Sequence, residues 1–212
     1  MAKDEHAPEL TPELILSAYA QGIFPMAESR DDDRLFWVDP EERGVMPLDG
    51  FHISRSLRKT ILQAPYQIKV DTAFSAVVEG CADRDETWIN DQILNIYMGL
   101  FNAGFAHSIE VWDGADLVGG AYGVSLKGAF FGESMFSRKP NASKIAMAYL
   151  VSRLNAGGFT LLDTQFLTPH LASMGGVEIS RISYHEALRD ALKVEANFHR
   201  QPPTVSGRQV CT

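Results

Sequence analysis

Apolar residues recur every three or four positions in several segments of the chain, the spacing that buries one face of an α-helix. Residues that favour the start of a helix precede four of these segments: Thr11-Pro12, Asp71, Asn90 and Asn141. A last helix is expected to begin with the capping box Ser183-x-x-Glu186. The pattern therefore predicts five helices.

A different pattern, rich in valine, aromatic residues and glycine, fills the middle of the chain. It predicts three antiparallel strands over residues 108–112, 117–124 and 128–135. A buried strand over residues 159–166 follows the helix that begins at Asn141. This order is typical of an α/β or α+β fold with one βαβ step across residues 141–158.

The composition is that of an ordinary globular protein, with 45% hydrophobic and 22% charged residues in a chain of 212. No apolar run is long enough to cross a bilayer, and residues 1–10 do not have the pattern of a secretory signal. Cys81 is expected to be a buried thiol and Cys211 an ordinary residue of the tail, with no disulfide framework or zinc site. We therefore expect a cytoplasmic protein.

The formal net charge of −8 argues against a general nucleic-acid binder, because phosphate contacts favour a basic surface. The densest basic stretch, residues 52–59, could still hold phosphates through Arg55, Arg58 and Lys59. A solvated face is the alternative interpretation of these residues.

Two further groups of polar residues interrupt predicted strands. Glu133 stands in an apolar run at a strand end, where it is either a positioned anion or a carboxylate that faces water. Asp163 and Gln165 are two positions apart in an apolar strand, so the alternation of side chains predicts that they share one face. Such a pair requires hydrogen-bond partners or a chemical task, and a satisfied structural pair is the alternative.

Other chemical signals are weaker. Trp37 and Trp88 would be core residues or stacking platforms for a base, and His107 is expected to be structural. The sequence shows no Ser-His-Asp order, no metal-ligand cluster and no glycine-rich phosphate loop. The residues alone favour a transferase without naming its substrate.

Eight short stretches follow one another along the chain: residues 18–25, 52–56, 87–89, 107–112, 117–120, 132–137, 141–144 and 163–165. They read AYAQGIFP, HISRS, TWI, HSIEVW, LVGG, GESMFS, NASK and DTQ. In this order they resemble one family, leucyl/phenylalanyl-tRNA–protein transferase. Each stretch is short, but together they are very specific.

The resemblance implies a small, reduced N-terminal domain, residues 1–43, and a GNAT-like (acetyltransferase-like) domain, residues 44–212, whose mixed sheet is flanked by helices. The implied reaction moves Leu or Phe, and less readily Met, from aminoacyl-tRNA to an N-terminal Arg or Lys of a protein, which creates a degradation signal. The implied partners are Leu-tRNA, Phe-tRNA and these acceptor proteins. We expect a monomer with no cofactor, no metal and no membrane partner.

The resemblance also assigns roles by position. Asp163 and Gln165 look like the catalytic pair that helps to deprotonate the incoming α-amino group, and Glu133 looks like a recognition residue near the reacting groups. Trp88 looks like the stacking partner of the terminal adenosine. The other residues expected at the tRNA 3′ end and in the amino-acid pocket are Tyr97, Phe130, Met135, Ser137, Leu162 and Thr168.

Four positions depart from the family pattern. Met26 replaces a second stacking tryptophan, Thr168 an asparagine near the catalytic pair, Ala121 a pocket methionine and Phe131 a smaller residue. A different pocket shape is therefore expected.

Three alternatives stay open. A sister family transfers Leu to acidic N-termini, although residues 132–137 and 163–165 favour the enzyme for basic termini. An acyl-CoA acetyltransferase of the same fold would need a glycine-rich pyrophosphate loop, whereas residues 137–142 contain no glycine. A non-enzymatic tRNA-binding module would not need Asp163 and Gln165 to face inward together.

Overall fold

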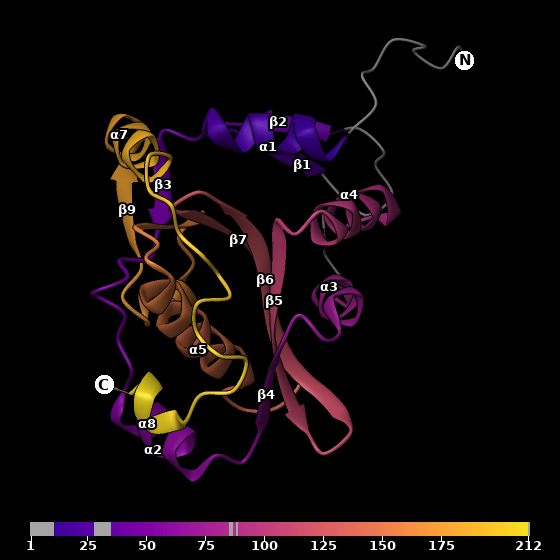
Figure 1. Ribbon diagram of the computed structural model, residues 1–212, viewed down its shortest axis with the longest axis vertical. Helices are drawn as coiled ribbons and strands as arrows, with labels where there is room; N and C mark the ends of the chain where they lie inside the picture. Colours follow the sequence, from indigo (N-terminus) through magenta and orange to yellow (C-terminus); the bar gives the residue numbers. More distant parts are fainter. Residues whose placement is uncertain (1–10, 28–34, 85–86, 88, 212) are drawn as a thin grey trace.

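A seven-stranded mixed sheet forms the centre of the protein. The computed structural model describes residues 11–27, 35–84, 87 and 89–211, and Figure 1 shows their arrangement. In sheet order the strands are β4 (Gln67–Val70), β5 (Ala106–Asp113), β6 (Asp116–Leu126), β7 (Ala129–Ser137), β8 (Leu161–Gln165), β3 (Glu42–Val45) and β9 (Val177–Ser180).

The predicted antiparallel strands and the βαβ step are confirmed. All neighbours in this sheet are antiparallel except β7 and β8, which are parallel and joined by helix α5 (Ala142–Gly157). Strands β3, β4 and β9 were not predicted. Each has only four residues, too few for a clear alternating pattern.

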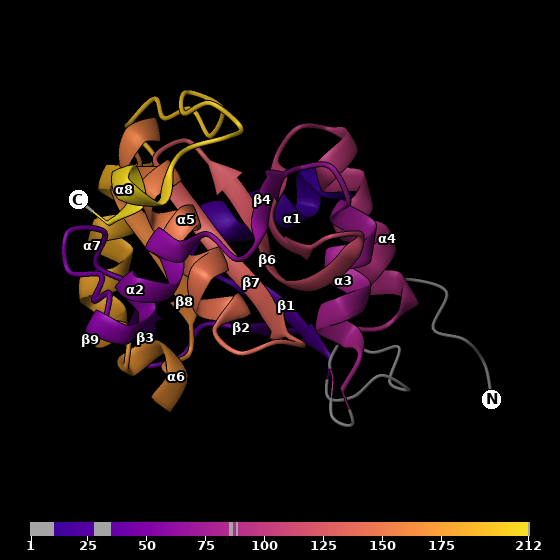
Figure 2. The ribbon, with the colours of Figure 1, turned by 90° about the horizontal axis from the view of Figure 1, so that it is seen from below.

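Helices cover both faces of the sheet, as Figure 1 and Figure 2 show from two directions. Helix α5 lies on one face together with α2 (Arg55–Gln63) and α8 (Gly207–Val210), whereas α3 (Phe74–Ala82) and α4 (Asp91–Asn102) lie on the other. The remaining helices are α1 (Pro12–Ala20), α6 (Pro169–Ala172) and α7 (Arg181–Ala191). None of the described helices is both long and apolar enough to cross a membrane.

Strand β7 shows how one strand supplies two cores. Phe130 and Met135 pack into the cluster that contains the residues of α5, while Phe131 and Phe136 pack into the cluster that contains those of α3 and α4. Successive side chains of a strand point to opposite faces, so a strand covered on both sides needs apolar residues at nearly every position. This need explains the apolar run that Glu133 interrupts.

Strands β7 and β8 pair over a short distance and then part. Their register runs from Ala129 opposite Leu161 to Phe131 opposite Asp163. Beyond that point β7 continues beside β6, and β8 continues beside β3. Gln165 ends β8 with φ of +56°, in the left-handed region, so the extended backbone is interrupted there. The parting of the strands leaves room for a cavity between their ends.

A two-stranded hairpin precedes this sheet. Strands β1 (Phe24–Ala27) and β2 (Leu35–Val38) pair antiparallel, and Figure 1 shows them with α1 across one end of the molecule. The predicted domain boundary, between residues 43 and 44, falls inside β3 of the large sheet. The division into two domains stays a prediction.

Local signals at two helix starts are confirmed. The Thr11 side chain accepts a hydrogen bond from the Leu14 N–H at the start of α1, and Asn90 does the same for Ile93 at the start of α4. Cys81 is buried in α3, as predicted, and Cys211 is buried as well.

Three predicted caps differ from the structure in whole or in part. Asp71 does not cap α3; the Glu110 carboxylate of β5 accepts the N–H groups of Thr72 and Ala73 instead. Asn141 stands at the cap position of α5 but makes no side-chain cap. At the start of α5 the Ser137 side chain accepts the Ser143 N–H.

The third correction concerns α7. This helix begins after Ser180, whose side chain accepts the Ser183 N–H, so the Ser183-x-x-Glu186 motif lies inside the helix. A capping box does occur in α8, between Ser206 and Gln209.

Candidate active site

A cavity of about 360 Å³ lies where β7 and β8 part. One side of it is apolar and receives side chains from β1, β7, α5, β8 and α6: Phe24, Met135, Met147, Leu150, Leu162 and Leu171. The polar groups Glu133 and Gln165 stand in the same lining. Further polar side chains in the lining are Arg84, Ser134, Thr164, Thr168 and His170. A largely apolar cavity that carries some polar groups is the usual form of a small-molecule site.

A buried ion pair joins Arg43 of β3 to Asp163 of β8, two residues before the cavity residue Gln165. Arg43 Nε lies 2.9 Å from Asp163 Oδ1, and Arg43 Nη2 lies 2.6 Å from Oδ2. Both residues are fully buried, and the guanidinium is stacked between the rings of Phe24 and Tyr184. Two parallel hydrogen bonds of this kind fix the orientation of a carboxylate.

Every strong acceptor direction of Asp163 is occupied. Besides the two bonds from Arg43, the Tyr184 hydroxyl donates to Oδ2 at 2.7 Å and the Gln165 N–H donates to Oδ1 at 2.8 Å. Asp163 does not line the cavity. Its carboxylate therefore has no open side from which it could meet a substrate.

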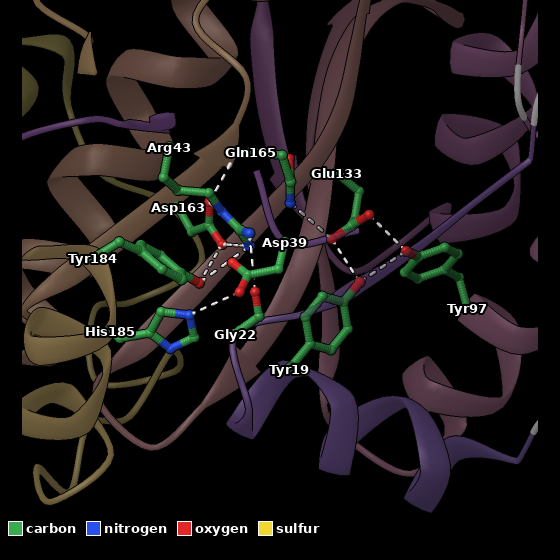
Figure 3. A network of polar contacts seen from close by, with 10 residues as sticks. All are labelled: Tyr19, Gly22, Asp39, Arg43, Tyr97, Glu133, Asp163, Gln165, Tyr184 and His185. Atoms are coloured by element: carbon green, nitrogen blue, oxygen red, sulfur yellow. Dashed lines mark hydrogen bonds and ion pairs between the residues drawn. The ribbon is translucent and has the colours of Figure 1, made fainter. Parts of the chain in front are cut away.

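Asp163 and Gln165, two positions apart at the end of β8, contact different partners. Gln165 lines the cavity, whereas Asp163 points to Arg43, as Figure 3 shows. Asp163 accepts from Tyr184, and the Glu133 that Gln165 holds accepts from Tyr19 and Tyr97; these three tyrosines belong to one buried cluster, which agrees with a shared face of the strand. The two residues still act as a pair, because the Gln165 N–H binds the Asp163 carboxylate.

Among the described residues, the carboxylate that lines the cavity is Glu133. The Tyr19 hydroxyl of α1 donates to Oε1 at 2.7 Å, and the Tyr97 hydroxyl of α4 donates to Oε2 at 2.6 Å. The Gln165 side-chain amide donates to Oε1 at 3.3 Å. Gln165 thus connects the Arg43–Asp163 pair to Glu133 (Figure 3).

The surroundings of Glu133 make its proton weakly acidic. Desolvation raises the pKa of Glu133 from 4.5 to about 7, against the hydrogen bonds from Tyr97 and Tyr19, which lower it. A carboxyl group with a pKa near 7 exchanges protons readily at neutral pH. Perturbed groups of this kind are typical of functional sites.

The structure brings together part of the predicted pocket. Glu133, Met135, Leu162, Gln165 and Thr168 line the cavity, and Thr168 also caps α6. Met26 and Ala121, two of the departures from the family pattern, line it as well.

Other predicted pocket residues lie elsewhere. Tyr97 is buried behind Glu133, and Phe130 is a core residue stacked on Phe198 at 5.6 Å between ring centroids. Ser137 is exposed and donates to the Lys139 carbonyl. Trp88, the predicted stacking residue, lies outside the described residues.

The predicted basic stretch forms an exposed surface. Arg55, Arg58 and Lys59 are exposed on α2, as the interpretation of a solvated face also required. Arg58 donates to the carbonyl of Cys211, so part of its charge is directed to the C-terminal segment. Figure 1 places α2 at the opposite end of the molecule from α1 and the β1–β2 hairpin.

Sequence reasoning missed Arg43, Tyr184 and the role of Tyr19. Arg43 and its partner are 120 positions apart, and no local pattern connects them. Tyr19 was visible only as one apolar position of α1, although it lies in the family-like stretch of residues 18–25. A buried polar strand residue such as Asp163 was the one available signal, because it requires a partner.

Comparison with known families gives a consistent match. The family model described as leucyl/phenylalanyl-tRNA protein transferase matches residues 45–189, and the model of the N-terminal domain of that transferase matches residues 8–41.

Relatives with the name leucyl/phenylalanyl-tRNA–protein transferase match along most of their length. The protein of Ruegeria sp. (strain TM1040) is 62% identical over 189 residues, which cover 89% of this chain and 90% of the relative. That of Roseobacter denitrificans is 58% identical over 201 residues, 95% of each chain. That of Maricaulis maris is 56% identical over 201 residues, 93% of each.

A solved structure, the crystal structure of FemX, resembles the fold. The two superpose with a TM-score of 0.53 at 12% sequence identity, covering 82% of this chain and 69% of that one. At this identity the likeness concerns the fold alone.

The buried pair leads to a stability prediction. Arg43→Met should lower the free energy of unfolding by about 3–5 kcal/mol, because it leaves the Asp163 carboxylate buried without a counter-charge. Urea unfolding measures this loss. The double variant Arg43→Met/Asp163→Leu removes both charges and should be more stable than the single variant.

Arg181→Met is the matched control. Arg181 forms its ion pair with Asp39 at a partly exposed position, so its loss should cost less than about 1 kcal/mol. An Arg43→Met variant as stable as this control would show that the buried pair does not hold the site.

Proposed function

The chain belongs to the leucyl/phenylalanyl-tRNA–protein transferase family, and we propose that it transfers leucine or phenylalanine from a tRNA to the N-terminal arginine or lysine of an acceptor protein. Methionine is a poorer donor, and the product carries a degradation signal. The observation that supports this proposal best is a largely apolar cavity in which Glu133 is the one carboxylate among the described lining residues.

The apolar side of the cavity suits the donor amino acid. Met135, Met147, Leu150 and Leu162 offer flexible or branched apolar surface to a leucine or phenylalanine side chain. Such a pocket separates donors by about 1–3 kcal/mol per methylene, so neighbouring sizes are accepted with graded efficiency. Ala121 enlarges the cavity where the family pattern has methionine.

The reaction is an aminolysis. The acceptor's α-amino nitrogen attacks the ester carbonyl of the aminoacyl-tRNA and forms a C–N bond, and the C–O bond to the terminal ribose breaks. The nitrogen loses a proton, and the departing ribose oxygen gains one. A site for this reaction needs a group that accepts the proton close to the attacking nitrogen.

We assign the proton acceptor to Glu133. Its carboxylate lines the cavity, whereas the four hydrogen bonds to Asp163 close that carboxylate to a substrate. Gln165 touches the cavity and holds Glu133 through its side-chain amide. Asp163 is then a positioning residue that fixes the backbone of Gln165, and this assignment revises the role that the resemblance gave to it.

The tRNA is held at two places in this proposal. Trp88 stacks on the terminal adenine by analogy with the family, while Met26 stands in the cavity lining in place of a second tryptophan. Arg55, Arg58 and Lys59 provide a few phosphate contacts for the tRNA body. So few contacts give weak, salt-sensitive binding, and specificity then comes from the esterified amino acid.

We also propose that residues 44–212 form an acetyltransferase-like fold and that the protein acts as a cytoplasmic monomer. The parallel β7–α5–β8 unit with parting strands and the likeness to FemX support the fold. The family resemblance supports the rest.

A transfer assay tests the proposed activity directly. The purified chain should transfer labelled leucine from Leu-tRNA to peptides that begin with Arg or Lys, without added cofactor. Peptides that begin with Asp or Glu serve as the matched acceptors. Transfer confined to the acidic peptides would move the chain to the sister activity, and transfer of an acetyl group from acetyl-CoA would contradict the proposed donor.

A second expectation concerns Glu133. Glu133→Gln keeps the shape of the side chain but removes the proton acceptor, so turnover at neutral pH should fall by about 10²–10⁴-fold. Because the ionised fraction of Glu133 rises as pH rises through about 7, the ratio of wild-type to variant rate should increase from acidic pH and level off above neutrality. Single-turnover rates measure this ratio.

The ratio is the informative quantity, because the acceptor's own α-amino group titrates at about 7.7–8.0 and affects both proteins alike. Glu186→Gln, an exposed substitution on α7, is the control and should give a ratio near unity at every pH. If the ratio of wild-type to Glu133→Gln rate does not change with pH, Glu133 is not the proton acceptor.

A further inference from the structure

Three side chains from distant parts of the chain meet on the sheet edge away from the cavity. They are Asp71 at the end of β4, His107 of β5 and His199 of the C-terminal segment. His107 Nδ1 lies 2.8 Å and His199 Nε2 lies 3.7 Å from Asp71 Oδ2. One ligand atom from each residue lies within 4.8 Å of the others, and none of the three residues lines the cavity.

Neighbouring groups hold Asp71 and His107 in place. The Ser108 N–H donates to Asp71 Oδ1 at 2.7 Å, which leaves Oδ2 directed at the two histidines. His107 Nε2 lies 3.2 Å from the Ser125 hydroxyl, and the His107 ring stacks on Phe198 at 4.0 Å. Outer partners of this kind are what orient a histidine and a carboxylate that bind a metal.

His199 is held through the backbone next to it. The Arg153 guanidinium donates to the carbonyls of Phe198, Gln201 and Pro202 at 3.0, 2.8 and 2.6 Å, and these bonds fix the turn that carries His199. The positive charge of Arg153 acts on His199, whose pKa is lowered mainly by desolvation and also by this charge. The His199 side chain is 62% exposed, so an ion could enter from this side.

We propose that Asp71, His107 and His199 form a binding site for a divalent transition-metal ion, with zinc as the best match. Two imidazole nitrogens and one carboxylate oxygen are a preferred ligand set for zinc. Tetrahedral zinc bonds of about 2.0–2.1 Å place ligand atoms about 3.3 Å apart, close to the 2.8 and 3.7 Å found here. A water molecule would complete the four-coordinate site.

The proposal departs from the expectation of a protein without a metal site, because the sequence alone did not reveal this cluster. The three residues are 36 and 92 positions apart, so no spacing motif reveals them. An ion here would join the C-terminal segment to β4 and β5 at the sheet edge, a structural role that is independent of the transfer reaction. His107, which was expected to be structural, is one of the three proposed ligands, and Asp71 is the residue that both histidines contact.

The test is metal binding by the full chain after treatment with a chelator. Zinc should bind in competition with a chromogenic chelator and should raise the thermal midpoint, because it binds the folded state. Cobalt should give the visible absorption of a four-coordinate ion. His199→Gln should weaken zinc binding by about tenfold or more and abolish the cobalt spectrum.

His185→Gln is the matched control. His185 also contacts a carboxylate, Asp39 at 3.1 Å, but belongs to no such cluster among the described residues. It should bind zinc as the parent does. Because His199 is largely exposed, its variant should melt at the parental temperature without metal. If zinc does not bind, or if His199→Gln binds it as well as the parent does, the proposal is overturned, and the three residues serve only as a hydrogen-bonded contact between the C-terminal segment and the sheet.

Discussion

The ion pair between Arg43 and Asp163 holds the parts of the site in register. It lies between β3 and β8, and Arg43 also donates to the Gly22 carbonyl beyond α1, while the Tyr184 hydroxyl of α7 donates to Asp163. Two charges without solvent are costly unless each is satisfied, and here four donors satisfy the carboxylate. The pair therefore fixes where β8 ends and where Gln165 stands.

Because the ion pair encloses Asp163, the two acidic residues Asp163 and Glu133 have different roles. Asp163 is closed in by its donors, and Glu133 lines the cavity with a pKa raised to about 7 by desolvation. The folded protein keeps the Glu133 proton that an unfolded chain releases near pH 4.5, so its contribution to stability falls as pH rises from about 4.5 to 7. The same raised pKa suits Glu133 to its proposed role as the proton acceptor of the transfer reaction.

Much of the fold could be predicted where the signal is local. Thr11 and Asn90 cap helices as expected, and β5 to β7 follow their valine-rich and aromatic pattern. Prediction fails where a residue distant in the sequence supplies the contact: at the start of α3 the Ala73 N–H donates to Glu110, whereas Asp71 was the predicted acceptor. Likewise, residues near Glu133, Gln165 among them, could be named from the family-like stretches, whereas no local pattern pointed to Arg43.

The protonation of Glu133 is the quantity on which the proposed chemistry depends most directly. Carbon-13 NMR of protein labelled at the glutamate carboxyl groups can follow it, with the Glu133 signal assigned by its loss in Glu133→Gln. The structure predicts that this signal titrates with a midpoint of about 7, because burial in the cavity wall disfavours the charge. A midpoint near the ordinary value of 4.5 would contradict the account, since Glu133 would then be a solvated carboxylate with no retained proton.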